Sequence, residues 1–171
     1  MKISIITLFP EVFDPILNSS ILKRAQKKGL VEFEFINLRD FGEGKHKIVD
    51  DRPYGGGAGM ILRADILARA VKKTKNQKVI LTSASGKKYT QRTAKKFSKL
   101  KSFTIICGHY EGVDQRFIDK YVDEEVSIGD YVLTGGEIPA MAIVDSVVRL
   151  IPGVLKKEAT KEESFSEGYL E

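Results

Sequence analysis

The side chains that could do chemistry in this sequence stand beside four glycine-rich segments. The segments are residues 49–60, 82–86, 107–112 and 127–140. Glycine permits tight backbone turns and lets a flat ligand lie directly against the main chain. The polar and charged side chains near them, which can move protons or bind anions, are Asp50, Arg52, His109, Glu111, Ser127, Asp130 and Arg149. Because strand-like and helix-like stretches separate the segments, we expect one composite site built from loop ends.

Known nucleotide-binding motifs are absent from these segments. A Walker A loop requires Gly-Lys followed by Ser or Thr, and neither Gly44-Lys45 nor Gly86-Lys87 is followed by either residue. The spaced glycines of the dinucleotide fingerprint do not match either. An enzyme that uses GTP or NAD is therefore disfavoured. Taken singly, the glycines are also explained by tight turns, Glu111 by a solvated loop charge, and Arg149 by a cation at a helix end.

Alternating apolar and amphipathic stretches must position these loops. Strand-like runs are expected at residues 2–8, 31–36, 78–82, 103–107 and 125–128. Helical patterns lie between them, at residues 19–28, 62–73, 90–100, 114–121 and 137–151. Gly29 is a natural stop for the first helix, and Thr90 and Asp114 are expected N-caps. The alternation predicts an α/β fold whose parallel sheet is flanked by helices.

Two segments break this alternation, and one helix is unusually apolar. Residues 38–60 show no hydrophobic period and are expected to form a long, functional loop. Residues 156–171 are rich in charge and lack a core pattern, as expected of a linker or exposed tail. The helix at 137–151 is apolar around more than half of its circumference. It is therefore either buried beneath other elements or faces a partner subunit.

Composition narrows the function classes further. The 171 residues favour one domain, and a net charge of +5 permits a nucleic-acid partner without demanding one. No apolar run approaches about 18 residues, so no membrane span is expected. Residues 1–10 lack a signal-peptide cleavage site, and we expect a first strand of a cytoplasmic protein. Cys107 is the only cysteine and is expected to be a buried, inert thiol; with two histidines, it argues against structural zinc.

Taken together, the motifs closely resemble the bacterial tRNA (guanine-N1)-methyltransferases of the SPOUT superfamily, which methylate the guanine just 3′ of the anticodon. The resemblance covers the whole chain. It rests on the segments at residues 5–11, 49–60, 107–112, 127–140 and 149–155.

The resemblance implies a specific fold and cofactor site. It implies an α/β domain over residues 1–155 with a deep C-terminal trefoil knot, which periodicity alone does not predict. It also implies a homodimer with each site at the subunit interface, and S-adenosylmethionine bound in the knot largely by main-chain atoms. The implied cofactor-binding residues are Leu81, Thr82, Ser83, Gly108, Tyr110, Glu111, Gly112, Ser127, Ile128, Gly129, Tyr131, Leu133, Gly135, Gly136 and Pro139.

The resemblance also assigns roles in catalysis and tRNA binding. Glu163 corresponds to the general base that removes the proton from guanine N1, and Arg149 to the cation that stabilises charge on O6. Glu111 is implied as a third catalytic residue, associated with stimulation by Mg²⁺. The implied substrate-binding residues are His46, Asp50, Arg52, Tyr54, Gly55 and Gly59.

The chain departs from the family pattern at three places and in length. Glu163 stands where the family has Asp, Ala84-Ser85 where it usually has Pro-Gln, and His109 where Arg is common. Family members continue into a helical, tRNA-binding C-terminal domain, whereas this sequence stops at Glu171, within the linker of residues 156–171. We therefore expect cofactor binding with impaired tRNA methylation.

Two alternatives remain open at the level of sequence. One is another knotted RNA methyltransferase that acts on a different base or on a ribose hydroxyl, which analysis of the product nucleoside would separate. The other is a non-catalytic RNA-binding module, which would have no affinity for S-adenosylmethionine.

Overall fold

A five-stranded parallel sheet forms the centre of the computed structural model, which describes residues 1–75 and 78–156. Its strand order is β2-β1-β6-β5-β7. The strands are β1 (Lys2–Thr7), β2 (Glu32–Asn37), β5 (Val79–Lys88), β6 (Ser102–Cys107) and β7 (Glu124–Ser127). The register places Ile5 between Phe35 and Ile105. The predicted α/β fold with a parallel sheet is confirmed, and the central strands β1 and β6 are almost entirely buried because both faces of the sheet are covered.

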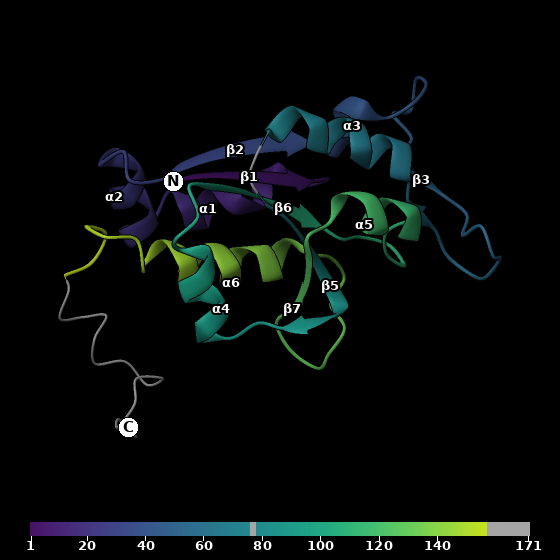
Figure 1. The fold of residues 1–171 in the computed structure, drawn as a ribbon. Helices are drawn as coiled ribbons and strands as arrows, with labels where there is room; N and C mark the ends of the chain where they lie inside the picture. Colours follow the sequence, from purple (N-terminus) through teal and green to yellow (C-terminus); the bar gives the residue numbers. More distant parts are fainter. Residues whose placement is uncertain (76–77, 157–171) are drawn as a thin grey trace.

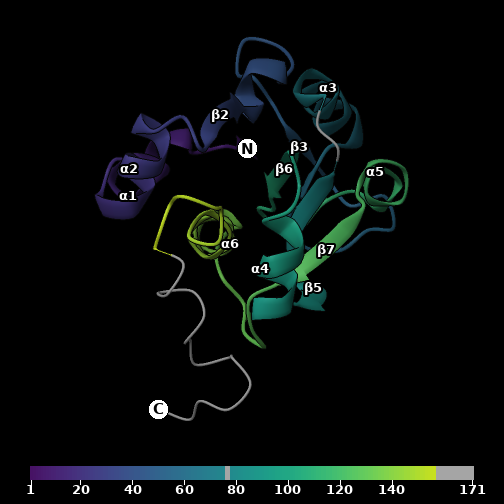
Figure 2. The same cartoon turned by 60° about the vertical axis from the view of Figure 1, so that its left-hand side comes forward.

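Helices cover both faces of the sheet (Figures 1 and 2). On one face, α3 (Ala64–Thr74) and α5 (Gln115–Tyr121) pack with the 3₁₀ turn η2 (Leu38–Phe41). The elements on the other face are η1 (Pro10–Phe13), α1 (Asp14–Leu17), α2 (Ser20–Lys27), α4 (Gln91–Phe97) and α6 (Glu137–Val148). Each face has its own cluster of fully buried side chains, with Phe103 in one and Ile106 in the other. In the part of the chain that the structure describes, no helix has the length and hydropathy to cross a bilayer.

Helix boundaries follow the expected capping chemistry. Gly29 has a φ of +67°, and the N–H of Leu30 donates to the carbonyl of Ala25 with an N···O distance of 3.0 Å. Both features are typical of a helix that ends at a glycine. The Thr90 hydroxyl accepts from a backbone N–H of the first turn of α4, and Asp114 does the same for α5. All three predicted helix-end residues are therefore confirmed.

The segment predicted as a long loop contains more structure than expected. Besides η2, residues 50–51 (β3) and 61–62 (β4) pair as a short antiparallel ladder. The backbone N–H of Arg63 donates to the carbonyl of Val49 at 3.0 Å, which closes the base of the intervening loop. The helical residues 10–17 were also not predicted. Elements this short show no periodicity in the sequence. They are fixed in place by buried neighbours such as Val49.

The apolar helix α6 is largely buried within its own chain. It packs against β6, α2 and α4, and the hydroxyls of Tyr89 and Ser146 lie 2.7 Å apart across the contact with the segment before α4. Residues such as Ile143 and Val147 are fully buried. Ile138, at the start of the helix, remains 57% exposed. Burial beneath other elements thus accounts for most of the apolar surface of this helix.

Candidate active site

A cavity of about 440 Å³ lies where β6 and β7 end and where β5 is interrupted between Thr82 and Lys87. Ligands of open parallel α/β sheets bind at this carboxyl edge of the strands. All of the residues predicted to bind a cofactor line this one cavity. They are Leu81, Thr82, Ser83, Gly108, Tyr110, Glu111, Gly112, Ser127, Ile128, Gly129, Tyr131, Leu133, Gly135, Gly136 and Pro139. The three loops that contain them meet as the sequence predicted.

At Gly136, the absence of a side chain lets two loops of the cavity pass close to each other. A Cβ built on Gly136 would lie 2.6 Å from the backbone N of Gly108 and 2.8 Å from Cα of Cys107, and closer still to the Thr82 hydroxyl. The Gly136 N–H donates to the Gly108 carbonyl at 2.7 Å. At Gly129 an added Cβ would instead strike the ring of Tyr131. The close approach of two backbone segments, rather than contact with a ligand alone, therefore requires glycine at Gly136.

His109 supplies an unsatisfied polar atom at the wall of the cavity. Its ring lies between Phe9 and Tyr110, at centroid distances of 5.3 Å and 4.9 Å. Its Nδ1 is buried and has no hydrogen-bond partner among the residues that the structure describes. Buried polar atoms are normally paired, so this nitrogen indicates a place for a polar group of a ligand.

Glu111 connects the cavity to the loop between β3 and β4. Its backbone N–H donates to the carbonyl of Met60 at 2.9 Å. The backbone N–H of Leu62 donates to the carbonyl of Gly112 at 2.9 Å. A Cβ built on Gly59 would lie 2.8 Å from Oε1 of Glu111, so this carboxylate packs directly on the glycine backbone. The structure thereby brings together a predicted catalytic residue and a predicted substrate-binding residue.

The other predicted substrate-binding residues lie before β3, within it and in the loop that follows it. Asp50 is half-buried in β3, whereas His46, Arg52, Tyr54 and Gly55 are exposed. None of these five lines the cavity. These residues are therefore not part of the cavity wall, and their role in substrate binding stays a prediction.

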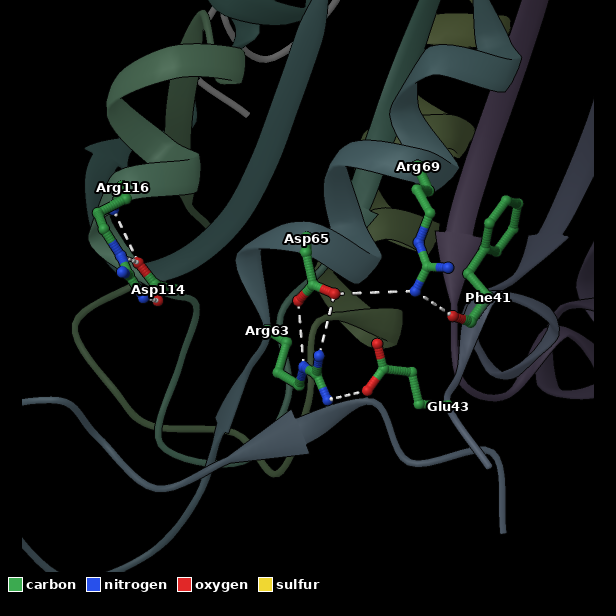
Figure 3. Close-up of polar contacts among 7 residues, drawn as sticks. All are labelled: Phe41, Glu43, Arg63, Asp65, Arg69, Asp114 and Arg116. Atoms are coloured by element: carbon green, nitrogen blue, oxygen red, sulfur yellow. Dashed lines mark hydrogen bonds and ion pairs between the residues drawn. The ribbon is translucent and has the colours of Figure 1, made fainter. Parts of the chain in front are cut away.

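Ion pairs hold the ends of this loop (Figure 3). Arg63 donates to Glu43 at 2.9 Å and, through two nitrogens, to Asp65 at 3.1 Å and 3.0 Å. The hydrogen bonds that Arg63 donates to Asp65 and Glu43 raise the pKa of Arg63, so the guanidinium stays charged. Arg69 donates to the carbonyl of Phe41 at 2.8 Å. These contacts tie residues 41–43 to the start of α3, and they could not be predicted from local sequence because the partners are up to 28 residues apart.

Of the other predicted catalytic residues, one lies away from the cavity and one falls outside the described residues. Arg149 caps the C-terminal end of α6 and does not line the cavity, which lies at the N-terminal end of that helix. Glu163 lies outside the described residues. Cys107 is buried as predicted; burial, together with the charge of Glu137, raises its thiol pKa.

Sequence reasoning missed several residues of the cavity wall. Gln115 and Ile118 of α5 and Glu125 of β7 line it beside the loops. The sequence signal for Gln115 was its place directly after the N-cap Asp114, which brings the start of α5 to the same edge of the sheet. Within residues 1–75 and 78–156, no three His, Cys, Asp or Glu side chains cluster as a metal site would require. The acidic residues of the cavity therefore do not form a metal cage.

Comparisons with known proteins give a consistent result. A family model described as tRNA (guanine-1)-methyltransferase TrmD matches residues 1–171. A tRNA (guanine-N(1)-)-methyltransferase of Caldicellulosiruptor saccharolyticus is 53% identical over 174 residues, which cover 100% of this chain and 71% of that protein. The protein of the same name from Bacillus subtilis is 50% identical over 177 residues, covering 100% of this chain and 73% of that protein. The similarity thus includes every glycine-rich segment.

Proposed function

Because this chain belongs to the tRNA (guanine-1)-methyltransferase family, we propose that it methylates N1 of the guanine that follows the anticodon on its 3′ side. The observation that supports this most strongly is the family match over residues 1–171. The chain is an S-adenosylmethionine-dependent tRNA (guanine-N1)-methyltransferase. Methylation at this position protects the reading frame, and the enzyme would act in the cytoplasm, where its tRNA is found.

We assign the cofactor to the cavity of about 440 Å³. S-adenosylmethionine supplies a methyl group bound to a positively charged sulfur. The loops at residues 81–83, 108–112 and 127–139 would hold it largely through backbone groups. The unpaired Nδ1 of His109 would meet one of its polar groups. We assign no step to Mg²⁺.

The deep trefoil knot of the family is part of the same proposal. In a knotted chain, one segment must pass through a loop formed by another, so the backbones must approach closely. Gly136 approaches Gly108 and Thr82 as closely as such a knot would require, with an N···O distance of 2.7 Å between the two glycines. This close approach supports the proposed knot and explains why two glycines meet there.

The chemistry defines roles for three side chains. Neutral guanine has a proton on N1, so a base must accept it as the N1–methyl bond forms, and we assign this role to Glu163. Negative charge builds on O6 as the proton leaves, and Arg149 would stabilise it there. As the bond from the methyl group to N1 forms, its bond to sulfur breaks, which leaves a neutral thioether and a neutral methylated guanine. Glu111, packed against Gly59, would help to position the guanine between the loop and the cavity.

A homodimer would complete this site. Arg149 follows α6, and it lies ten residues along the chain from Pro139, the cavity-lining residue nearest to it in sequence. At about 1.5 Å per residue this helical stretch spans about 15 Å, farther than an arginine side chain reaches. Large apolar side chains are exposed beside the cavity, namely Tyr131 (55%), Val132 (86%) and Ile138 (57%). We therefore propose that a second subunit covers them and contributes Arg149 of the partner subunit.

Product analysis tests the reaction. The purified chain is incubated with S-adenosylmethionine and a tRNA transcript that has guanine after the anticodon, and the digested product is separated by chromatography. We expect 1-methylguanosine, and none from a transcript with adenine at that position. A methylated ribose or a different base would refute the assignment, and absence of both methylation and cofactor binding would refute the enzyme class.

Complementation between inactive variants tests the composite site. Glu111→Gln and Arg149→Ala are co-expressed with different affinity tags, and the mixed dimer is purified through both. If the two residues act together across the interface, one of its two sites is intact and methylation is restored. If both residues act within one subunit, each site lacks one of them and the mixed dimer stays inactive.

A further inference from the structure

The excess positive charge of the chain is concentrated in one surface, formed by residues 87–101 and called the basic surface below. These residues include α4 and contain seven Lys or Arg residues but no Asp or Glu, whereas the net charge of the whole chain is +5. The rest of the sequence is therefore net negative. All seven cationic side chains are exposed, and none of them lines the cofactor cavity. Charge distributed so unevenly indicates a polyanionic partner.

Helix geometry gathers the central cations on one side of α4. Arg92, Lys95 and Lys99, called the cation row below, are separated by three and four residues. This spacing places neighbours on one face, about one helical turn of 5.4 Å apart. Lys99 continues the row just beyond the helix, which ends at Phe97. The opposite face, with Ala94 and Phe97, is fully buried and packs beside α6 (Figure 2), so the helix is a fixed support for the row.

Carboxylates neutralise only part of the basic surface. Lys96 pairs with Glu124 at 3.1 Å, and Lys88 pairs with Asp130 at 3.5 Å. The second pair is exposed on both sides, so it holds its lysine only weakly. Among residues 1–75 and 78–156, the three side chains of the cation row form no ion pair with a carboxylate. These cations are therefore available to an anion from outside the chain.

The basic surface lacks the features that bind single strands or membranes. Its two aromatic rings are not exposed platforms, because Phe97 is buried and the half-buried Tyr89 has its hydroxyl 2.7 Å from that of Ser146. Sites for unpaired nucleotides combine cations with rings on which bases stack. No large apolar side chain of residues 87–101 is exposed for insertion into lipid either. Cations alone favour the backbone of a duplex, which proteins contact through its phosphates and 2′-hydroxyls.

We propose that the basic surface binds the phosphate backbone of double-stranded RNA, without reading its sequence, at a place separate from the methylation site. The cation row contacts neighbouring phosphates of one strand. Helix α4 follows β5 at the edge of the sheet where the cavity lies, and residues 99–101 lead to the start of β6 at the opposite edge. An RNA helix along this surface therefore extends away from the cavity. That the nucleic acid is RNA rests on the proposed function, whereas the phosphate contacts do not depend on it.

Two triple variants of equal net charge test the basic surface. The α4 variant combines Arg92→Gln, Lys95→Gln and Lys99→Gln. The control variant combines Arg24→Gln, Lys23→Gln and Lys27→Gln, which are one Arg and two Lys exposed on α2. Binding of a labelled, blunt-ended RNA duplex of about 16 base pairs is measured by fluorescence anisotropy at salt concentrations from about 50 to 200 mM.

The salt dependence separates phosphate contacts from a general loss of charge. The α4 variant should raise the Kd of the duplex about tenfold or more at about 50 mM salt. Its slope of log affinity against log salt should become shallower by about three, one for each lost contact. The control variant should stay near wild type in both, and both variants should keep the wild-type Tm and affinity for S-adenosylmethionine. Equal losses in the two variants, or an unchanged slope in the α4 variant, would overturn the proposal.

Competition identifies the partner. Wild type should prefer the duplex to a single-stranded RNA of the same length and to vesicles containing phosphatidylserine. Tighter binding of the single strand or of the vesicles would overturn the proposal, as would a shift of the α4 variant towards monomer in sedimentation. Duplex binding is measured without turnover, so failure to form 1-methylguanosine refutes only the proposed function. Methylation without duplex binding refutes only the present inference.

Discussion

Replacing Gly136 with alanine tests whether the loops around the cavity leave room for a side chain. Gly136 has φ −85° and ψ 0°, a conformation that alanine adopts without strain. Its added Cβ would nevertheless lie 2.6 Å from the backbone N of Gly108 and 2.8 Å from Cα of Cys107. Both are backbone atoms at the end of a central strand, so they cannot rotate away as a flexible side chain would.

The expected loss of stability follows from three contributions. Alanine restricts the unfolded chain, which stabilises the protein by about 0.4–1 kcal/mol. Alanine is also a poorer N-cap than glycine for α6, which costs about 0.5–1 kcal/mol and cancels the first effect. The collision remains, and overpacking of a rigid site costs about 1–3 kcal/mol. We expect a value near the upper end, about 3 kcal/mol, because two of the nearest atoms belong to backbone.

Thermal unfolding measures this loss. For a chain of 171 residues, about 3 kcal/mol lowers Tm by roughly 6–12 °C. Gly55→Ala is the matched control, because a Cβ there would meet no atom within 4 Å, and its Tm should stay near wild type. Calorimetric titration should also show weaker binding of S-adenosylmethionine to Gly136→Ala. A Tm within about 2 °C of wild type, with cofactor binding intact, would refute the close crossing of the loops.

Three further predictions follow from buried or capping groups. Burial opposes ionisation of Glu124, but Lys78 and Lys96, at 2.8 Å and 3.1 Å, lower its pKa. Its ion pairs therefore stabilise the fold above the carboxyl's unfolded pKa of about 4.3, and this is lost as pH falls through the lower folded pKa. Glu124→Gln should cost about 1 kcal/mol in urea unfolding at pH 7 and much less at pH 3. Asp114→Ala should cost about 1 kcal/mol by removing the cap of α5, whereas Asp114→Asn should keep most of it, as compared by Tm. Burial raises the pKa of Cys107, so a thiol reagent at pH 8 should modify it only in urea; rapid labelling of the native chain would contradict its burial.

Much of the fold was predictable because its determinants are local. Buried parallel strands need continuous apolar residues, and the run at 103–107 became β6. Helix ends were equally readable at Gly29, Thr90 and Asp114, since a cap depends on residues within one turn. The β3–β4 pair was missed because each strand is two residues long and is held by contacts from distant parts of the chain.

The cavity wall was predictable only with the help of family resemblance. Glycine clusters indicated where backbones approach closely, but not whether a ligand or another loop makes the approach. At Gly136 the neighbour is the loop at Gly108, so local sequence could not identify the function of that glycine.

The separation of Arg149 from the cavity has a consequence for the architecture of the active enzyme. Glu111 and the cofactor loops belong to one end of α6, and Arg149 to the other, with a rigid helix of 12 residues between them. If both act on one guanine, α6 cannot bend to bring them together, so two copies of the chain must be arranged to do so. In a two-fold dimer the contact is reciprocal, and each partner would complete the other's site. The exposed apolar side chains beside the cavity, Val132 and Ile138, are then explained by the same contact. Dimer formation in this protein would therefore be a requirement of the chemistry rather than an addition to stability.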